Sequence, residues 1–404
     1  MNADMEKIWG KTFAKRTEKI KSSVIRELLK ITQQPDIISF AGGLPAPELF
    51  PIREIEEACR YLLPRLGQKM LQYSPTEGIQ QLKEFLAEKM QKYGVPAEPE
   101  NILPTHGSQQ ALDLIGKVFI NEGDKILTSR PTYLGAIQAW NAYAPQYLTV
   151  RMDDHGMIVD EMEEILKNHK IKFIYVLPNF HNPAGVTLSL ERRKKITELA
   201  EKYDTFIVED DPYGELRYEG EDLPTLVSMK KERVIYLSTF SKTLAPGLRL
   251  AWITAPSFVI KKLVQAKQGA DLHTGTFVQY IAWDVADRGI IKAHVKKIRE
   301  VYKRRRDLML EAMEKYFPKK GVKWTRPEGG MFLWVILPEG VDTAKLLEKA
   351  VEKKVAYVPG FAFYPNADDG KNTMRLNFSN ASEENIVEGI KRLGELLKEE
   401  LGEK

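Results

Sequence analysis

The sequence predicts an α/β protein with a mostly parallel, seven-stranded sheet in a large domain, joined to a smaller α+β domain. Between about residues 100 and 255, short apolar runs alternate with helical patterns. Strands that are apolar almost throughout, with helices between them, are typical of a parallel sheet covered on both faces. A chain of 404 residues also exceeds one ordinary core, so two domains are expected.

The large domain has seven candidate strands, with amphipathic helices between them. We expect the strands at residues 102–103, 125–128, 147–150, 173–177, 206–208, 234–237 and 250–254. The clearest helical patterns are at residues 108–119, 133–143, 160–168 and 190–203. In such sheets, ligand-binding groups lie in the loops at the carboxyl ends of the strands.

The pattern changes after residue 257, where long helices run to about Phe317 and strands alternate with helices beyond it. We expect residues 1–45 to form an N-terminal arm and part of the small domain, with a helix at 24–32. Residues 46–285 are expected to form the large domain and residues 286–404 the small domain.

Charge and histidine spacing argue against two classes of function. The 60 basic and 56 acidic residues give a net charge of +4 without a long block of one sign. The short basic run at residues 303–306 fits a solvated helix face, so a nucleic-acid site is not supported. The six histidines show no metal-ligand spacing, and a metalloenzyme is not supported either.

Several features of composition favour a cytoplasmic protein. Cys59 is the single cysteine, so no disulfide forms within the chain. No apolar run approaches the ~20 residues of a membrane span, and the charged first 30 residues do not resemble a signal peptide. A Lys/Glu-rich composition also fits a heat-stable protein.

The most informative segment is residues 236–250. An apolar strand leads into a small polar turn that contains Ser241 and Lys242, and Arg249 follows seven residues after the lysine. A lysine at a strand end, with neighbouring hydroxyls and a nearby cation, is what a Schiff-base site with a phosphate-binding group needs. For any one lysine, the alternative is a solvated surface position.

Two earlier strand-end loops contain residues suited to a phosphorylated, planar ligand. Gly107 and Ser108 open a helix, where free backbone amides can bind a phosphate. For Ser108 taken alone, an N-cap is the commoner role. Tyr133 could place its ring over a planar heterocycle, or it could be a core aromatic residue at a helix start.

Two later loops supply groups for the rest of such a ring. The Asn182 amide could donate to a phenolate oxygen, although Asn-Pro at residues 182–183 is also a common turn. Asp210 ends an apolar strand, where a carboxylate is costly unless it meets a cation. A protonated pyridine nitrogen would meet that need, and Tyr213 could reach the same oxygen as Asn182. The alternative for Asp210 is a turn or cap carboxylate.

The ordered set of motifs resembles the fold-type I pyridoxal 5'-phosphate (PLP) enzymes, in particular the class I/II aminotransferases. The resemblance rests on residues 107–110, Tyr133, residues 182–185, residues 210–213, Ser241, Lys242, Arg249 and Arg375, and it covers essentially the whole chain. Residues 41–45 and 71–78 resemble the branch of 2-aminoadipate, kynurenine and archaeal aromatic or multiple-substrate aminotransferases.

This resemblance implies a role for each matching residue. Lys242 would bind PLP as a Schiff base and shuttle a proton, Asp210 would pair with the pyridine nitrogen, and Tyr133 would stack on the ring. Asn182 and Tyr213 would hold the phenolic oxygen, and Arg375 would bind the substrate α-carboxylate. The phosphate would be held by Ser108, Gln109, Ser241 and Arg249, with Thr239 as a further candidate, and by Tyr73 from the neighbouring subunit of a homodimer.

The resemblance also implies the reaction. We expect ping-pong transamination between an L-amino acid, aromatic or 2-aminoadipate- or glutamate-like, and a 2-oxo acid such as 2-oxoglutarate. Gly43 would leave room for the substrate side chain. Arg26 would meet a distal carboxylate, unless it is a surface helix residue.

Three alternatives remain at this point. They are a PLP-dependent carbon–sulfur lyase or decarboxylase, an alanine–glyoxylate type of aminotransferase, and a transcription regulator with an aminotransferase-like domain. The third would need a winged helix and a linker, for which the forty residues before residue 41 are too few.

Overall fold

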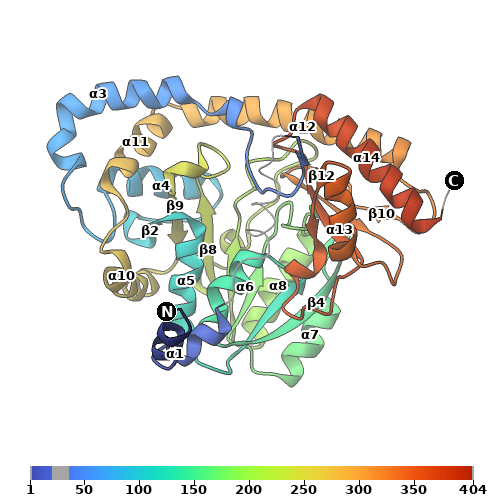
Figure 1. Cartoon of the computed structure of the whole chain (residues 1–404). Helices are drawn as coiled ribbons and strands as arrows, with labels where there is room; N and C mark the ends of the chain where they lie inside the picture. The colour runs from blue at the N-terminus through green and yellow to red at the C-terminus, as the bar shows by residue number, and fades with distance from the viewer. Residues whose placement is uncertain (1, 21–35, 403–404) are drawn as a thin grey trace.

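The computed structural model describes residues 2–20 and 36–402. Arg26 and the helix predicted at residues 24–32 lie outside the described residues. In the view of Figure 1, the large sheet and its helices occupy the left and centre of the molecule, and the C-terminal strands and helices lie on the right. The first helix, α1 (Asn2–Gly10), lies at the lower left.

The large sheet has the strand order β2-β9-β8-β7-β6-β3-β4-β5. Its strands are β2 (Ile102–Thr105), β3 (Lys125–Arg130), β4 (Gln146–Asp153), β5 (Gly156–Met157), β6 (Phe173–Val176), β7 (Phe206–Asp210), β8 (Val234–Thr239) and β9 (Ala251–Thr254). Five neighbouring strands, β8-β7-β6-β3-β4, pair in parallel, whereas β9 runs antiparallel to both β8 and β2. The seven predicted strands are confirmed. The eighth, β5, is a two-residue hairpin extension of β4, too short to leave an apolar run in the sequence.

Helices cover both faces of this sheet. They are α3 (Ile52–Met70), α4 (Gln80–Lys92), α5 (Gly107–Phe119), α6 (Leu134–Asn141), α7 (Val159–Asn168), α8 (Leu190–Lys202), α9 (Leu226–Met229), α10 (Ser257–Asp271) and α11 (Thr276–Asp287). Alternate residues of β6 face opposite cores: Phe173 and Tyr175 pack with α5, α6 and α10, while Ile174 and Val176 pack with α4, α7 and α8. This two-sided burial explains why the strands are apolar almost throughout.

The small domain is built on an antiparallel sheet of order β10-β11-β14-β13. Its strands are β10 (Lys323–Trp324), β11 (Phe332–Ile336), β13 (Val358–Pro359) and β14 (Thr373–Asn377), and its helices are α12 (Ile290–Tyr316), α13 (Thr343–Glu352) and α14 (Glu383–Leu401). Strand β1 (Ile38–Ser39) pairs in parallel with β12 (Val355–Ala356), so the N-terminal segment joins this domain.

Helix α12 contributes side chains to two hydrophobic cores. Val295 packs in a core of the large sheet, whereas Ile298 and Tyr302, one and two turns later, pack in the core of the small domain. The change from one core to the other therefore falls inside this helix. The domain borders at residues 45 and 285 stay predictions.

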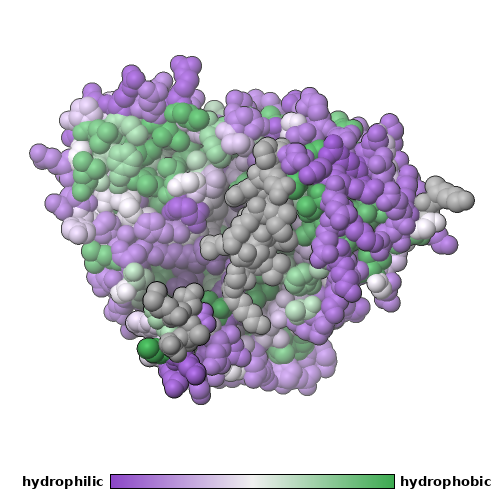
Figure 2. Space-filling view, in the orientation of Figure 1, coloured by the Kyte–Doolittle hydropathy of each residue, from purple (hydrophilic) through white to green (hydrophobic). Residues whose placement is uncertain are grey.

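One part of the surface is hydrophobic. Figure 2 shows hydrophobic residues gathered at the upper left of the molecule, where Figure 1 places α3 and α11. Exposed apolar side chains on and after α3 include Leu63, Leu71 and Tyr73. Within the described residues, no helix is long and apolar enough to cross a membrane.

Candidate active site

Lys242 lies three residues after the end of β8 and is partly buried. Its Nζ donates a hydrogen bond to the backbone oxygen of Gly43, 2.9 Å away, so the N-terminal segment reaches the strand ends. Burial lowers the pKa of Lys242 to about 8, and the positive charges of Arg375 and Arg249 contribute in the same direction. A lysine with this pKa is partly neutral near neutral pH and can act as a base.

Asp210 is the last residue of β7 and is buried. Its Oδ2 accepts a hydrogen bond from the Tyr175 hydroxyl at 2.8 Å, while its Oδ1 has no hydrogen-bond partner among the described residues. Burial raises the pKa of Asp210 to about 7, against the opposing effect of the Tyr175 bond. A buried carboxylate oxygen without a donor is costly, and a protonated ring nitrogen at Oδ1 would satisfy it.

Arg375, in β14 of the small domain, is joined to the loop after β6. Its Nη1 donates to Oδ1 of Asn182 at 2.9 Å, and the Asn182 Nδ2 donates to the Tyr213 hydroxyl at 3.2 Å. The Nη2 of Arg375 donates to the backbone oxygen of Ala41 at 2.9 Å. A single connected set therefore joins the small domain, two strand-end loops and the N-terminal segment.

Two aromatic rings flank the Arg375 guanidinium. Its central carbon lies 4.3 Å from the ring centre of Phe332 and 4.9 Å from that of Phe363. Burial lowers the pKa of Arg375 to about 10, and the Nε of this side chain has no hydrogen-bond partner among the described residues. A buried, oriented guanidinium with a free donor is suited to a carboxylate.

Tyr133 begins α6, and its ring lies back over the first turn of that helix. A Cβ added to Gly135 would lie 2.5 Å from ring atoms of Tyr133, so glycine is needed for this close approach. The Gln109 side chain donates to the Gly135 carbonyl at 2.8 Å rather than to another polar side chain. The pKa of Tyr133 is raised by burial and by the charge of Asp210, which places its hydroxyl in the field of that carboxylate.

The start of α5 and the turn after β8 form a polar cradle. At Gly107 the backbone φ is +71°, and an added Cβ would lie 2.3 Å from Nη2 of Arg249. The guanidinium of Arg249 therefore lies against the helix N-terminus, and its Nη1 is 3.5 Å from Oγ of Ser241. Thr239 donates to Ser241 Oγ at 3.0 Å, and the buried Ser108 hydroxyl has no partner among the described residues. Free amides, hydroxyls and one guanidinium are the groups that bind phosphate.

Of the other residues named from the sequence, the structure describes Tyr73 and Gly43. Tyr73 is 77% exposed, and its ring packs edge-on against His273 with centres 5.8 Å apart. Gly43 lies between Lys242 and Phe332, because a Cβ added to it would lie 3.6 Å from the Phe332 ring. Arg26 lies outside the described residues.

Sequence reasoning missed Tyr175 and Phe332. Tyr175 holds Asp210, and its signal was a hydroxyl-bearing ring in the otherwise apolar strand at residues 173–177. Phe332 lies beside Arg375, but its sequence position did not indicate a site residue. It belongs to an apolar strand that was expected to contribute only to the core.

PLP fits these residues. The coenzyme has a ring nitrogen for the unpaired Asp210 Oδ1, an aldehyde for the Lys242 amine and a phosphate for the cradle at Arg249. A lysine and a buried carboxylate at the carboxyl ends of neighbouring strands, in this α/β sheet, define a fold-type I PLP enzyme.

Comparison with known proteins gives the family. The model for aminotransferase class I and II matches residues 46–393, so the chain belongs to that family. It is 52% identical to "Aromatic-amino-acid aminotransferase 1" of Thermococcus litoralis over 400 residues, covering 97% of this chain and 95% of the relative.

Solved structures agree with this assignment. A multiple substrate aminotransferase from Thermococcus profundus superposes with a TM-score of 0.94 at 49% identity, covering 98% of this chain and 100% of that one. A kynurenine aminotransferase of Pyrococcus horikoshii, solved in complex with PMP, gives 0.93 at 49% identity, with 97% and 98% coverage. The chain is therefore a PLP-dependent aminotransferase that acts on amino acids and 2-oxo acids.

Proposed function

We propose that the enzyme transfers the amino group of a broad range of L-amino acids, aromatic and 2-aminoadipate- or glutamate-like, to a 2-oxo acid such as 2-oxoglutarate. The proposal is supported by the names of similar proteins, among them an aromatic-amino-acid, a multiple substrate and a kynurenine aminotransferase. Apolar and aromatic pockets separate similar side chains only weakly, which fits a broad range.

The observation that carries the proposal is the Arg375 cluster. Arg375 is buried, lies between two phenylalanine rings and is bonded to Asn182. We assign it the α-carboxylate that all amino acid and 2-oxo acid substrates share. Its planar fork fixes the carboxylate in two places, so the α-carbon is oriented in the same way for different side chains.

The remaining roles follow from the contacts. When bound, PLP supplies a ring that accepts the electrons left at the substrate α-carbon. In this proposal Asp210 would keep the ring nitrogen protonated, Asn182 and Tyr213 would donate to the phenolic oxygen, and Tyr133 would cover the ring. The phosphate would be held by Ser108, Gln109, Thr239, Ser241 and Arg249.

Lys242 has two tasks in this proposal. It binds the coenzyme aldehyde when no substrate is present, and it removes and returns the substrate α-proton once its amine is released. Its lowered pKa suits the second task, because a larger fraction of the amine is neutral at neutral pH. Burial, with a further contribution from the nearby charges of Arg375 and Arg249, maintains that lowered pKa.

We further propose a cytoplasmic homodimer in which Tyr73 reaches the phosphate of the neighbouring subunit. The exposed apolar side chains of α3, together with Tyr73, give a surface suited to a second copy (Figure 2). Tyr73→Phe should then weaken PLP binding, whereas Tyr61→Phe, on the exposed side of α3, should not. Equal PLP affinity in both variants would contradict this assignment.

A donor screen tests the substrate range. Purified enzyme is assayed with aromatic, 2-aminoadipate, glutamate, alanine and branched-chain donors, with 2-oxoglutarate and glyoxylate as acceptors. We expect turnover of aromatic and long acidic donors only when a 2-oxo acid is present. Turnover without any 2-oxo acid would favour the carbon–sulfur lyase alternative.

The role of Arg26 is tested in the same screen. Arg26→Ala should lower kcat/KM for acidic donors more than for aromatic ones, because the distal carboxylate loses its partner. Arg16→Ala, at an exposed position of the same N-terminal segment, is the matched control. An unchanged ratio of acidic to aromatic donors would remove this role.

A further inference from the structure

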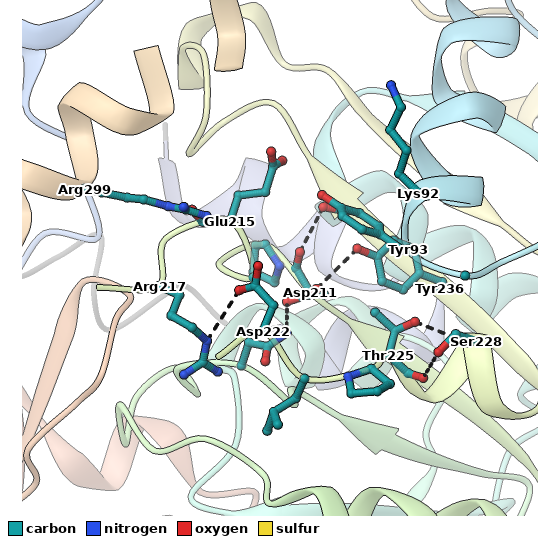
Figure 3. A pocket seen from close by; sticks show the side chains of 17 residues that line it. Lys92, Tyr93, Asp211, Glu215, Arg217, Asp222, Thr225, Ser228, Tyr236 and Arg299 are labelled. Carbon is teal, nitrogen blue, oxygen red and sulfur yellow. Dashed lines mark hydrogen bonds and ion pairs between the residues drawn. The ribbon is translucent and has the colours of Figure 1, made fainter. Parts of the chain in front are cut away.

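A pocket of about 680 Å³ is lined in part by Asp211, the residue that follows the proposed coenzyme-binding Asp210. Its lining also includes residues of the segments after β6 and β7, Tyr236 and Ser238 of β8, Lys92 and Tyr93 at the end of α4, and Arg299 of α12. Figure 3 shows Asp211 at its centre, with Tyr93 and Tyr236 on one side and Arg217 with Asp222 on the other. Asp211 directly follows Asp210.

The Asp211 carboxylate is buried and held on both oxygens. Its Oδ1 accepts from the Asn179 side-chain amide at 2.9 Å, and its Oδ2 accepts from the Tyr236 hydroxyl at 3.3 Å. Its backbone N–H donates to Leu237, and its carbonyl accepts from Ser238, both on β8. Asp211 therefore cannot turn without moving the strand end that carries Asp210.

A buried arginine stands behind Asn179. Arg193, on α8, is fully buried, and its Nη2 donates to Oδ1 of Asn179 at 2.6 Å. Three backbone carbonyls accept its other hydrogen bonds. Hydrogen bonds therefore link Arg193 to Asn179 and Asn179 to Asp211. The carboxylate at the end of this series belongs to the residue next to Asp210.

An ionised Asp211 needs the donors of these hydrogen bonds, because burial and a neighbouring acidic residue both disfavour its charge. Burial raises the pKa of Asp211, whereas Asn179, Arg193 and Tyr236 lower it and the charge of Glu215 raises it. Glu209, two residues earlier, is also buried, and burial raises its pKa to about 7 although two backbone amides of α9 hold it. Asp211 in turn raises the pKa of Asp210. Negative charge at Asp211 thus makes Asp210 a stronger proton acceptor.

We propose that Asp211 is a positioning residue for the coenzyme. Asn179, backed by Arg193, donates to its carboxylate and favours the ionised form against the effect of burial, and a negative charge there would strengthen the bond of Asp210 to the protonated ring nitrogen. This inference rests on the proposed role of Asp210 and adds a residue that touches neither substrate nor coenzyme.

Asp211→Asn is the direct test. The variant keeps the size of the side chain and loses its charge, so we expect PLP affinity and kcat to fall roughly ten- to hundred-fold. The KM for the amino donor should change less than about two-fold, since Asp211 does not touch substrate. Asp222→Asn is the matched control, because this carboxylate lies at the same cavity with its side chain 79% exposed.

Chemical rescue separates charge from shape. In Asp211→Ala, the cavity gives small solutes access to the vacated carboxylate position. Formate should restore PLP affinity, measured by absorbance titration of the apoenzyme, and neutral formamide of similar size should not. Equal rescue by both would overturn the role of charge, and wild-type PLP affinity in Asp211→Asn would overturn the proposal.

A second variant leaves Asp211 itself unchanged, so that a loss of PLP affinity can be told apart from misfolding caused by a substitution at Asp211. Asn179→Ala cuts the link to Arg193 but leaves the Asp211 carboxylate in place, and we expect a smaller loss of PLP affinity in the same direction. Unchanged affinity there, in a folded protein, would contradict the proposal. Asp210→Asn is assayed beside these variants. If Asp210→Asn is as active as wild type, the proposed role of Asp210 fails and that of Asp211 fails with it. If Asp210→Asn loses activity while Asp211→Asn keeps wild-type PLP affinity, only the role of Asp211 fails.

Discussion

Replacing Asp210 by asparagine should stabilise the apoenzyme while it abolishes most turnover. Asp210 is fully desolvated, and its Oδ1 has no partner among the described residues. In the unfolded chain, the same carboxylate is ionised at little cost. The folded apoenzyme therefore bears an unfavourable charge that the coenzyme nitrogen would compensate.

The magnitude follows from the pKa. A rise from 3.8 to about 7 means that the ionised form is disfavoured in the folded state. Burial of such a group does not change the free energy of unfolding below pH 3.8. Its destabilising effect grows as the pH rises to about 7 and is constant above that pH. At about 1.4 kcal/mol per unit, the cost is about 4 kcal/mol at pH 8 and about 2 kcal/mol at pH 5.

The asparagine side chain keeps the bond from Tyr175 through its Oδ1 but adds an unpaired amide. That amide costs about 1 to 3 kcal/mol at every pH. The characteristic result is therefore the difference between the two pH values. Relative to wild type, the Asp210→Asn apoenzyme should gain about 2 to 3 kcal/mol more at pH 8 than at pH 5.

Urea denaturation of both apoenzymes at pH 5 and pH 8 measures this difference. With PLP bound at pH 8, wild type should become more stable than the Asp210→Asn variant, because the protonated ring nitrogen then compensates the Asp210 carboxylate. A stability difference between wild type and variant that does not change with pH would refute the reasoning. Asp222→Asn, with its side chain 79% exposed, serves as the control and should change little at either pH.

Three further predictions concern the cradle, the guanidinium and the lysine. Gly107→Ala should weaken PLP binding at least ten-fold, because its Cβ would meet Arg249. The control Gly123→Ala is also at positive φ but has open space around it, so it should lower only stability, by about 1 kcal/mol. Equal PLP affinities of the two variants, measured by titration, would count against the cradle. Arg375→Lys should raise the KM for amino donors roughly 10- to 100-fold, since one ammonium cannot replace a bidentate fork, and an unchanged KM would exclude it as the carboxylate site. The kcat–pH profile should rise with pH and level off above about 8, as the Lys242 amine loses its proton; a midpoint near 10.5 would show that its pKa is not lowered.

Much of the fold and part of the site could be predicted because the relevant signals are local. Apolar strands with helices between them indicated the sheet, and polar residues at strand ends indicated where chemistry would lie. Asp210 ends β7, and Lys242 and Asn182 lie in the loops that follow β8 and β6, so the strand-end rule brings them to one edge.

Other features depend on contacts between distant segments and could not be predicted. Arg193 on α8 reaches Asp211 only through Asn179, and no spacing in the sequence links α8 to the end of β7. Phe332 lies beside Arg375 because β11 pairs with β14 in one register. Such pairings follow from packing of the whole chain rather than from any short motif.

The most direct test of the central claim is to locate the bound coenzyme. Reduction of the holoenzyme with borohydride fixes PLP to the amine that carries it, and peptide mass spectrometry then identifies the residue. We expect the label on Lys242 alone. A label on another lysine, such as the buried Lys267, or no label in an active enzyme, would contradict the account.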